Sequence, residues 1–289
     1  MCHWHEKAYA KVNLTLDVLG KRPDGYHDLH MLMQTVSLCD EITLAKTDDD
    51  TIRVTSNLSF LPSGKKNLAG LAAFVFLESL GLPTRGLCLN IRKEIPVCAG
   101  LGGGSADAAA VLRLLNRVYK TGLTATQLEE MAAQIGSDVP FCIRGGTQIA
   151  EGRGEKLTAL PSLPPCHIVL CKPPYSVSTG AVFALWHNGS AQHPDHSGVM
   201  DALSAHDLRG LSRRMYNVLE DILPVAQTDL RHIRNILTDT GALGVVMSGS
   251  GPTVLGLFDD AASAQTAGKI LRAQYLDTFV TTVTEALML

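Results

Sequence analysis

The sequence predicts an α+β protein built from two domains. Three observations support this. Residues 7–18 alternate between apolar and polar side chains with period two, which is typical of a strand with one buried face. Helix signals alternate with further strand-like runs along the rest of the chain. The proline-rich stretch at 158–165 divides two such regions, and 289 residues are enough for two hydrophobic cores.

The first region contains further strand-like runs and three helices. Asn67 is a favourable N-cap for a helix that ends at Gly81, and Thr124-x-x-Gln127 has the pattern of a capping box. The expected strands lie at 41–45, 51–55 and 87–91, and the expected helices at 68–80, at 107–119 and after Thr124.

The second region has the same mixed character. Expected there are strands at 167–171 and 279–284, helices at 179–186, near 199–222, at 229–240 and at 261–275, and two strands joined by residues 248–252. The domains are therefore predicted to span 1–158 and 159–289.

Composition excludes several classes of protein. Hydrophobic residues make up 46% and charged residues 18%, as in globular chains, and the net charge of −3 gives no basic excess for nucleic acid. No apolar run suggests a membrane span, and the N-terminus resembles neither a signal nor a transit peptide. The seven cysteines form no Cys-x-x-Cys pair, so reduced thiols and a cytoplasmic location are expected. His193 and His196 are too loosely spaced to predict a metal site.

The strongest chemical signal is the glycine-rich stretch from Pro96 to Ser105, which an Ala-rich helix follows. Glycines let backbone N–H groups approach an anion, and the helix N-terminus adds positive potential. No lysine follows the glycines, so the stretch is not a Walker A loop. Its preceding Lys-Glu-x-Pro also differs from the apolar strand of a dinucleotide-binding loop. A flexible glycine turn capped by Ser105 remains the alternative.

Two further segments are candidates for chemistry. Lys11 and Asn13 point to the same side of the first strand, about 7 Å apart. Asp138 lies between a helix-ending glycine and Pro140, where it is either a turn residue or a carboxylate at an acceptor hydroxyl. Met247–Thr253 also fits a plain hairpin loop, and the glycines of Gly152-x-Gly154 fit sheet turns.

Together these segments resemble a known family. AYAKVNLTLDV, PVCAGLGGGSADAA and MSGSGPT occur in the order typical of the GHMP kinases. The segments KRPDGYHDL at 21–29, GSDVPFCIRGGTQIAEGRGE at 136–155 and KPPYSVSTGAVF at 172–183 resemble the 4-diphosphocytidyl-2-C-methyl-D-erythritol kinase branch.

The resemblance implies a fold and a reaction. The fold has an N-terminal ATP-binding domain, similar to the second domain of ribosomal protein S5, and a C-terminal ferredoxin-like substrate domain. The active site lies in the cleft between them. The reaction uses ATP and Mg²⁺ to phosphorylate the 2-hydroxyl of a cytidyl-linked methylerythritol, in the non-mevalonate route to isoprenoid precursors.

The resemblance also implies roles for residues at matching positions. Asp138 would be the catalytic base, and Lys11 would bind both that base and the reacting hydroxyl, with its charge favouring ionised Asp138. The residues that would bind ATP are Pro96, Gly100, Leu101, Gly102, Gly103, Gly104 and Ser105 around the phosphates, and Asn67 and Lys93 beside the adenine. The residues that would bind the cytidyl substrate are Asn13, Tyr26, His27, Tyr175 and Thr179, with the two tyrosines as the walls of a cytosine slot.

Some of these roles have structural alternatives. Asn67 serves as an N-cap in any case, Tyr26 fits packing over the adjacent turn, and Lys93 fits a solvated strand position. Ala106 stands where many relatives have a second serine, and no protein ligand to the metal is predicted.

Two other functions remain open at this point. One is a GHMP kinase with a mevalonate-type or sugar acceptor, which would not need aromatic residues for a nucleobase. The other is a catalytically silent sensor, which is expected to lose Lys11 or Asp138, although both are present. The expected partner is a small molecule, bound by a monomer or a weak homodimer, with no nucleic acid and no membrane.

Overall fold

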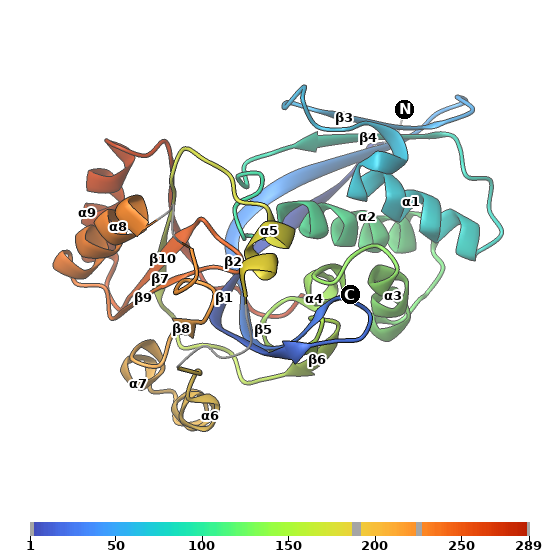
Figure 1. The fold of residues 1–289 in the computed structure, drawn as a ribbon. Coiled ribbons are helices and arrows are strands. Elements are labelled where there is room, and N and C mark those ends of the chain that lie inside the picture. The colour runs from blue at the N-terminus through green and yellow to red at the C-terminus, as the bar shows by residue number, and fades with distance from the viewer. Residues whose placement is uncertain (1–2, 187–191, 224–226, 288–289) are drawn as a thin grey trace.

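Two β-sheets, each covered by helices, form the protein in the computed structural model, which describes residues 3–186, 192–223 and 227–287 (Figure 1). The predicted α+β class with two regions is confirmed. The first sheet belongs mostly to the N-terminal half, and the second to the C-terminal half.

The first sheet has seven strands in the order β3-β4-β2-β1-β8, and β5 joins it by pairing with β2 and β6. Its two central strands are long and antiparallel to each other, and their register shifts at three points, one of them between Asn13 and Thr15. The strands are β1 (His3–Lys21), β2 (His27–Lys46), β3 (Ile52–Ser56), β4 (Leu87–Arg92), β5 (Thr147–Gly152), β6 (Lys156–Ala159) and β8 (Tyr216–Asn217).

Four α-helices and a short 3₁₀ turn accompany this sheet. The predicted caps are present: Asn67 accepts a hydrogen bond from the Ala69 N–H, and Thr124 forms the capping box with Gln127. The elements are η1 (Gly64–Lys66), α1 (Leu68–Ser79), α2 (Gly103–Tyr119), α3 (Ala125–Ala133) and α4 (Val139–Arg144).

The second sheet is antiparallel, with four strands in the order β11-β7-β10-β9. Figure 1 shows α8 and α9 beside it, while α5 lies between the two halves. The strands are β7 (His167–Lys172), β9 (Gly244–Met247), β10 (Val254–Phe258) and β11 (Asp277–Thr282). The helices are α5 (Thr179–Leu185), α6 (His196–Ser204), α7 (Leu208–Ser212), α8 (Gln227–Asp239) and α9 (Ala261–Arg272).

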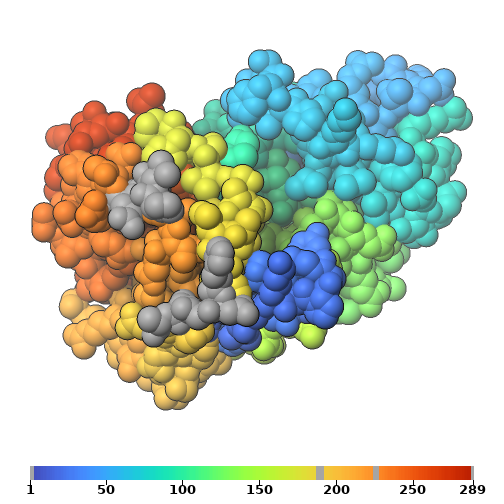
Figure 2. All heavy atoms as spheres, viewed as in Figure 1, coloured from blue at the N-terminus to red at the C-terminus, as the bar shows by residue number. Residues whose placement is uncertain are grey.

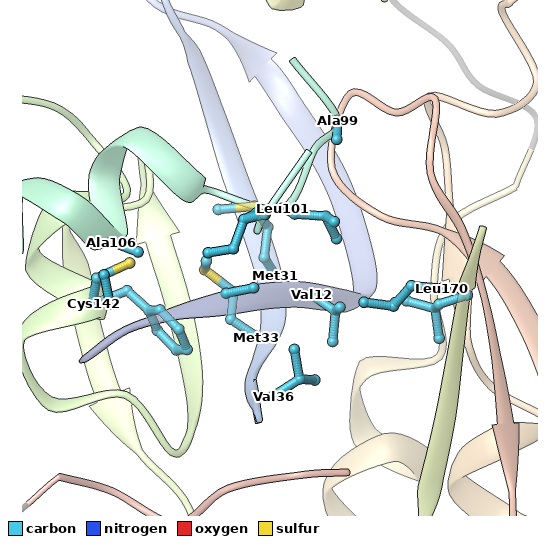
Figure 3. Packing of buried hydrophobic residues seen from close by; sticks show 14 of the residues in the cluster. Val12, Met31, Met33, Val36, Ala99, Leu101, Ala106, Cys142 and Leu170 are labelled. Atoms are coloured by element: carbon cyan, nitrogen blue, oxygen red, sulfur yellow. The ribbon is translucent and has the colours of Figure 1, made fainter. Parts of the chain in front are cut away.

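Several contacts join the two halves. Strand β8 pairs in parallel with β1, where Leu16 lies opposite Asn217. After β11 the chain returns to the first half, and isolated bridges join Val283 to Val36 and Ala286 to Gly145. The buried side chains form one hydrophobic cluster, in which Val12 of β1 and Leu170 of β7 approach each other (Figure 3).

Some elements differ from the prediction. Both faces of β1 are buried between residues 11 and 18, because its polar side chains are covered too: Lys11 lies close to Gly102, and Asp17 contacts His193 and His196. The helices expected near 199–222 end at 212, and β8 follows them. Helix α2 begins four residues earlier than predicted, with glycines in its first turn. The proposed boundary at 158/159 falls inside β6, one residue before that strand ends.

Candidate active site

A cavity of about 920 Å³ lies between the two halves, and both contribute to its walls. Figure 2 shows this face hollowed between the yellow segment around α5 and the cyan segments of the first half. All of the predicted site residues line the cavity except Leu101 and Tyr175. Those that do are Lys11, Asn13, Tyr26, His27, Asn67, Lys93, Pro96, Gly100, Gly102, Gly103, Gly104, Ser105, Asp138 and Thr179.

Lys11, Asn13 and Asp138 form a compact polar group on one wall. The Lys11 Nζ donates to Asn13 Oδ1 at 2.8 Å and lies 3.3 Å from Asp138 Oδ2. Lys11 and Asn13 are buried, whereas the Asp138 side chain keeps 31% of its surface exposed. Asp138 is the N-cap residue of α4, but its side chain makes no capping hydrogen bond. Its carboxylate is therefore directed at Lys11 and the cavity.

The glycine-rich loop faces this group. Gly100 and Gly102 have φ values of 76° and 67°, which favour glycine, and α2 begins directly after Gly102. Gly103 is not in that left-handed region, but an added Cβ would lie 3.1 Å from Ile95 Cγ2 and 3.3 Å from Lys93 Nζ. The loop thus presents backbone close to the cavity at the start of a long helix, as anion binding requires.

Leu101, which was predicted to bind ATP, does not line the cavity. Its side chain is buried and lies beside Met31 in the core (Figure 3). Its carbonyl accepts the backbone N–H of Lys11 at 3.0 Å. Leu101 therefore fixes the loop against β1.

A loop of the second half connects the two walls. The Ser248 hydroxyl accepts the Asn13 N–H at 3.2 Å and donates to the Gly100 carbonyl at 3.0 Å. The buried Asn217 amide donates to the carbonyls of Met247 and Gly249, each at 2.8 Å. The segment 247–253, for which a plain hairpin loop was one alternative, thus joins the glycine-rich loop to the strand that carries Lys11.

Asn67 and Lys93 line the cavity close to the start of α2. Lys93 is buried rather than solvated, and its ammonium donates to the carboxylates of Asp40 and Asp107. Desolvation, which the charge of Lys93 only partly offsets, raises the pKa of Asp107 to about 8. Asp107 lines the cavity, and its Oδ1 has no hydrogen-bond partner among the described residues.

Aromatic side chains gather at the opposite end. The His27 ring stacks on Phe183 of α5 with a centroid distance of 5.2 Å and meets the edge of Trp186 at 5.4 Å. Burial, and then the charge of Lys21, lower the pKa of His27, which favours a neutral imidazole. Tyr26 is 54% exposed at the rim. Thr179 shares a hydrogen bond of 2.8 Å with Ser250.

Tyr175, which was predicted to form one wall of a cytosine slot, does not line the cavity either. It packs against the core outside the cavity, where burial, followed by the charge of Asp229, raises its pKa to about 12. The sequence could not separate it from Phe183, because both aromatic residues belong to the same predicted segment.

The histidine pair near residue 195 has a structural role. His193 Nδ1 and His196 Nε2 contact the two carboxylate oxygens of buried Asp17 at 2.7 and 3.0 Å. These contacts attach the start of α6 to β1. Within the described residues, no group of three or more His, Cys, Asp or Glu side chains is arranged to hold a metal ion.

Sequence reasoning missed Asp40, Asp107, Asn217 and Phe183. Asp107 lies at the start of a predicted Ala-rich helix. A single carboxylate among alanines is unusual there, and this was the signal that could have identified it. The others had no distinctive local signal. Their importance comes from partners far away in the sequence, such as Gly249 for Asn217.

Comparisons with known proteins agree with this geometry. The model described as "GHMP kinases N terminal domain" matches residues 67–146, and "GHMP kinases C terminal" matches residues 199–277. A curated 4-diphosphocytidyl-2-C-methyl-D-erythritol kinase from Geobacillus sp. (strain WCH70) is 46% identical over 251 residues, which cover 87% of this chain and 86% of that protein.

Solved structures give the same picture. A crystal structure of 4-(cytidine 5'-diphospho)-2C-methyl-D-erythritol kinase has a TM-score of 0.81 at 33% identity and covers 97% of this chain and 99% of its own. The L. major mevalonate kinase, in complex with R-mevalonate, has a TM-score of 0.77 at 20% identity, with coverages of 98% and 96%, and supports the fold alone. None of the helices in the described parts of the chain is long and apolar enough to span a membrane.

Proposed function

Because this chain belongs to the GHMP kinases, and within them to the 4-diphosphocytidyl-2-C-methyl-D-erythritol kinase family, we propose that it transfers the γ-phosphoryl group of ATP to the 2-hydroxyl of 4-diphosphocytidyl-2-C-methyl-D-erythritol. The family that the motifs predicted is confirmed, and the chain is a kinase of the non-mevalonate isoprenoid pathway. The roles of individual residues are our proposal.

One observation carries the mechanism: Lys11 and Asp138 are paired at 3.3 Å on the wall that faces the glycine-rich loop. In our proposal the Asp138 carboxylate accepts the proton of the 2-hydroxyl. Lys11, held by Asn13, keeps that carboxylate in place and binds the reacting oxygen. A positioned base contributes about 10²–10⁴-fold to a rate. Phosphoryl transfer depends largely on positioning and charge stabilisation, which this rigid group supplies.

The glycine-rich loop fits a triphosphate. Gly100 to Ser105 bring backbone to the cavity, and the N-terminus of α2 adds its positive end. Asn67 and Lys93 would then lie beside the adenine. The Ser105 hydroxyl offers an oxygen atom in the same cavity, the ligand type that Mg²⁺ prefers, and the ion would neutralise phosphate charge when bound.

The aromatic end of the cavity favours a cytidyl substrate over a mevalonate-type or sugar acceptor. His27, Phe183 and Trp186 lie together there, and Tyr26 stands at the rim. We propose that Tyr26 and Phe183, rather than Tyr26 and Tyr175, stack on the cytosine, while neutral His27 hydrogen-bonds its polar edge. A silent sensor is disfavoured because Lys11 and Asp138 are present and in contact.

An ADP-release assay on the purified protein tests this function. Each of two acceptors, the cytidyl-methylerythritol substrate and mevalonate, is supplied with ATP and Mg²⁺. We expect turnover with the cytidyl substrate alone. Turnover with mevalonate at a comparable kcat/KM would contradict the proposed acceptor, and turnover with neither would contradict the proposed activity. The cytoplasmic location and the monomeric or weakly dimeric state remain predictions.

A further inference from the structure

The turn between β5 and β6 places one cation, Arg153, at the rim of the cavity. Gly152 and Gly154 on either side of it have φ values of 68° and 113°, so the turn has a conformation that other residues rarely adopt. The Glu155 carboxylate accepts the Arg153 N–H at 2.7 Å, and the Gly154 N–H donates to the Glu151 carbonyl at 3.0 Å. The backbone that carries the Arg153 side chain is thus well anchored.

Arg153 lies between the two ends of the proposed substrate site. Its guanidinium carbon is 5.1 Å from the centre of the Tyr26 ring, which belongs to the proposed cytosine slot. On the other side, a Cβ placed on the adjacent Gly154 would be 3.8 Å from Asp138 Oδ1 and 3.2 Å from Met31 Cε. The turn therefore lies between the aromatic residues proposed to bind cytosine and the carboxylate of Asp138.

The N–H donors of the Arg153 guanidinium are available to a ligand. Its only ion pair within the described part of the chain is a long one, 4.0 Å from Nε to Glu155 Oε2, and no hydrogen bond of the guanidinium is found there. A guanidinium carries five N–H donors in a planar fork that matches phosphate oxygens. The side chain is 35% exposed, so a ligand in the cavity can reach these donors.

We propose that Arg153 binds the diphosphate of the cytidyl substrate and is thereby a specificity residue of this kinase. The inference rests on the proposed function, because it uses the covalent order of that substrate. A diphosphate joins the cytidine to the methylerythritol. With the base at Tyr26 and the 2-hydroxyl at Asp138, the diphosphate has to cross the interval beside Arg153. The cation also packs on one face of Tyr26, which leaves the opposite face for the base.

The test compares ligands that differ only in their phosphates. Calorimetry measures the dissociation constants of cytidine and CDP for the wild type, Arg153→Met and Arg153→Lys. A saturating non-hydrolysable ATP analogue is present throughout, so that CDP does not occupy the glycine-rich loop. Lys156→Met is the matched control, because it removes a nearby exposed cation on β6 that does not line the cavity.

We expect Arg153→Met to weaken CDP binding by about tenfold to a hundredfold, the size expected for lost hydrogen bonds to a charged group. Cytidine should stay within about twofold of the wild type, because its binding uses the aromatic residues alone. Arg153→Lys should recover part of the CDP affinity, since it keeps the charge without the fork. Lys156→Met should leave both constants unchanged. In turnover, Arg153→Met should raise KM for the cytidyl substrate more than it lowers kcat.

Two results would overturn the inference. Equal losses for cytidine and CDP would mean that Arg153 only supports Tyr26, and unchanged CDP binding would mean that the diphosphate passes elsewhere. Failure of the proposed function itself looks different: the wild-type protein would then bind neither ligand and would not phosphorylate the cytidyl substrate. Melting temperatures of all variants separate these results from a loss of folding.

Discussion

Ser248 is the residue for which the structure makes its sharpest energetic prediction. Its buried hydroxyl joins Asn13, on the strand that carries Lys11, to Gly100 in the glycine-rich loop. Ser248→Ala removes both hydrogen bonds without adding bulk. The Asn13 N–H, which lies next to one of the register shifts of β1, and the Gly100 carbonyl then lose this partner.

The expected magnitude follows from these two groups. A buried polar group without a partner costs about 1–3 kcal/mol, so two such groups predict a loss of about 2–6 kcal/mol in the free energy of unfolding. The same change loosens the contact between the glycine-rich loop and β1, the strand that carries Lys11. Misplacement of reacting groups by about 1 Å costs on the order of a hundredfold in rate. We therefore expect kcat to fall by about tenfold to a hundredfold.

Thr253→Val is the matched control, because it also removes a buried hydroxyl near the same loop. The Thr253 Oγ1 has no partner among the described residues, so its replacement by a methyl group should be neutral or slightly stabilising. Equilibrium urea unfolding gives the free energies, and the ADP-release assay gives kcat. Similar unfolding free energies for the two variants would refute the proposed role of the Ser248 hydrogen bonds. A destabilised Ser248→Ala protein with wild-type kcat would limit that role to folding.

Five further substitutions test the site. Asp138→Asn should lower kcat by about 10²–10⁴-fold and leave ATP affinity nearly unchanged, and a loss below about tenfold in steady-state kinetics would refute its role as a base. Gly103→Val should weaken ATP binding about tenfold or more, because its side chain competes with the loop's neighbours and the phosphates for space; calorimetry on the folded variant checks this. Phe183→Ala should weaken the cytidyl substrate about tenfold to a hundredfold and spare ATP, whereas Tyr175→Ala should lower the melting temperature and affect both ligands alike. Desolvation raises the pKa of Asp107 from 3.8 to about 8, so the protonated group stabilises the fold below pH 4 and this stabilisation is lost as the pH rises through about 8. Asp107→Asn should therefore flatten the dependence of the unfolding free energy on pH between about 4 and 8, and an unchanged slope would contradict the raised pKa.

Local signals predicted the elements whose causes are local. The N-cap at Asn67 and the capping box at Thr124 formed as expected, because each depends on residues only two or three positions apart. Long-range pairing decided the elements that were missed. Strand β8 has two residues and exists because it pairs with Thr15 and Leu16 of β1. No property of residues 216–217 alone distinguishes them from a continued helix.

The same distinction between local and long-range causes applies to the residues of the site. The glycine-rich loop and the Lys11–Asn13 pair could be read from the sequence, because one needs flexible backbone and the other needs the period of a strand. Lys93 could not be assigned its environment, since the burial that pairs it with Asp40 and Asp107 depends on how β2 and α2 pack. Tertiary packing also decides that Phe183, and not Tyr175, lines the cavity.

The second half of the chain contributes to the chemistry through backbone as much as through side chains. Gly249 comes so close to the proposed catalytic group that an added Cβ would lie 3.4 Å from Lys11 Nζ and 3.3 Å from Asn13 Oδ1. Asn217 holds the carbonyl of this glycine, and β8 ties Asn217 to β1. Contacts thus run from β1 to β8, from Asn217 of β8 to the loop that carries Ser248, and from that loop back to β1. The position of Lys11 therefore depends on both halves of the protein, although all the groups proposed to handle the proton lie in the first.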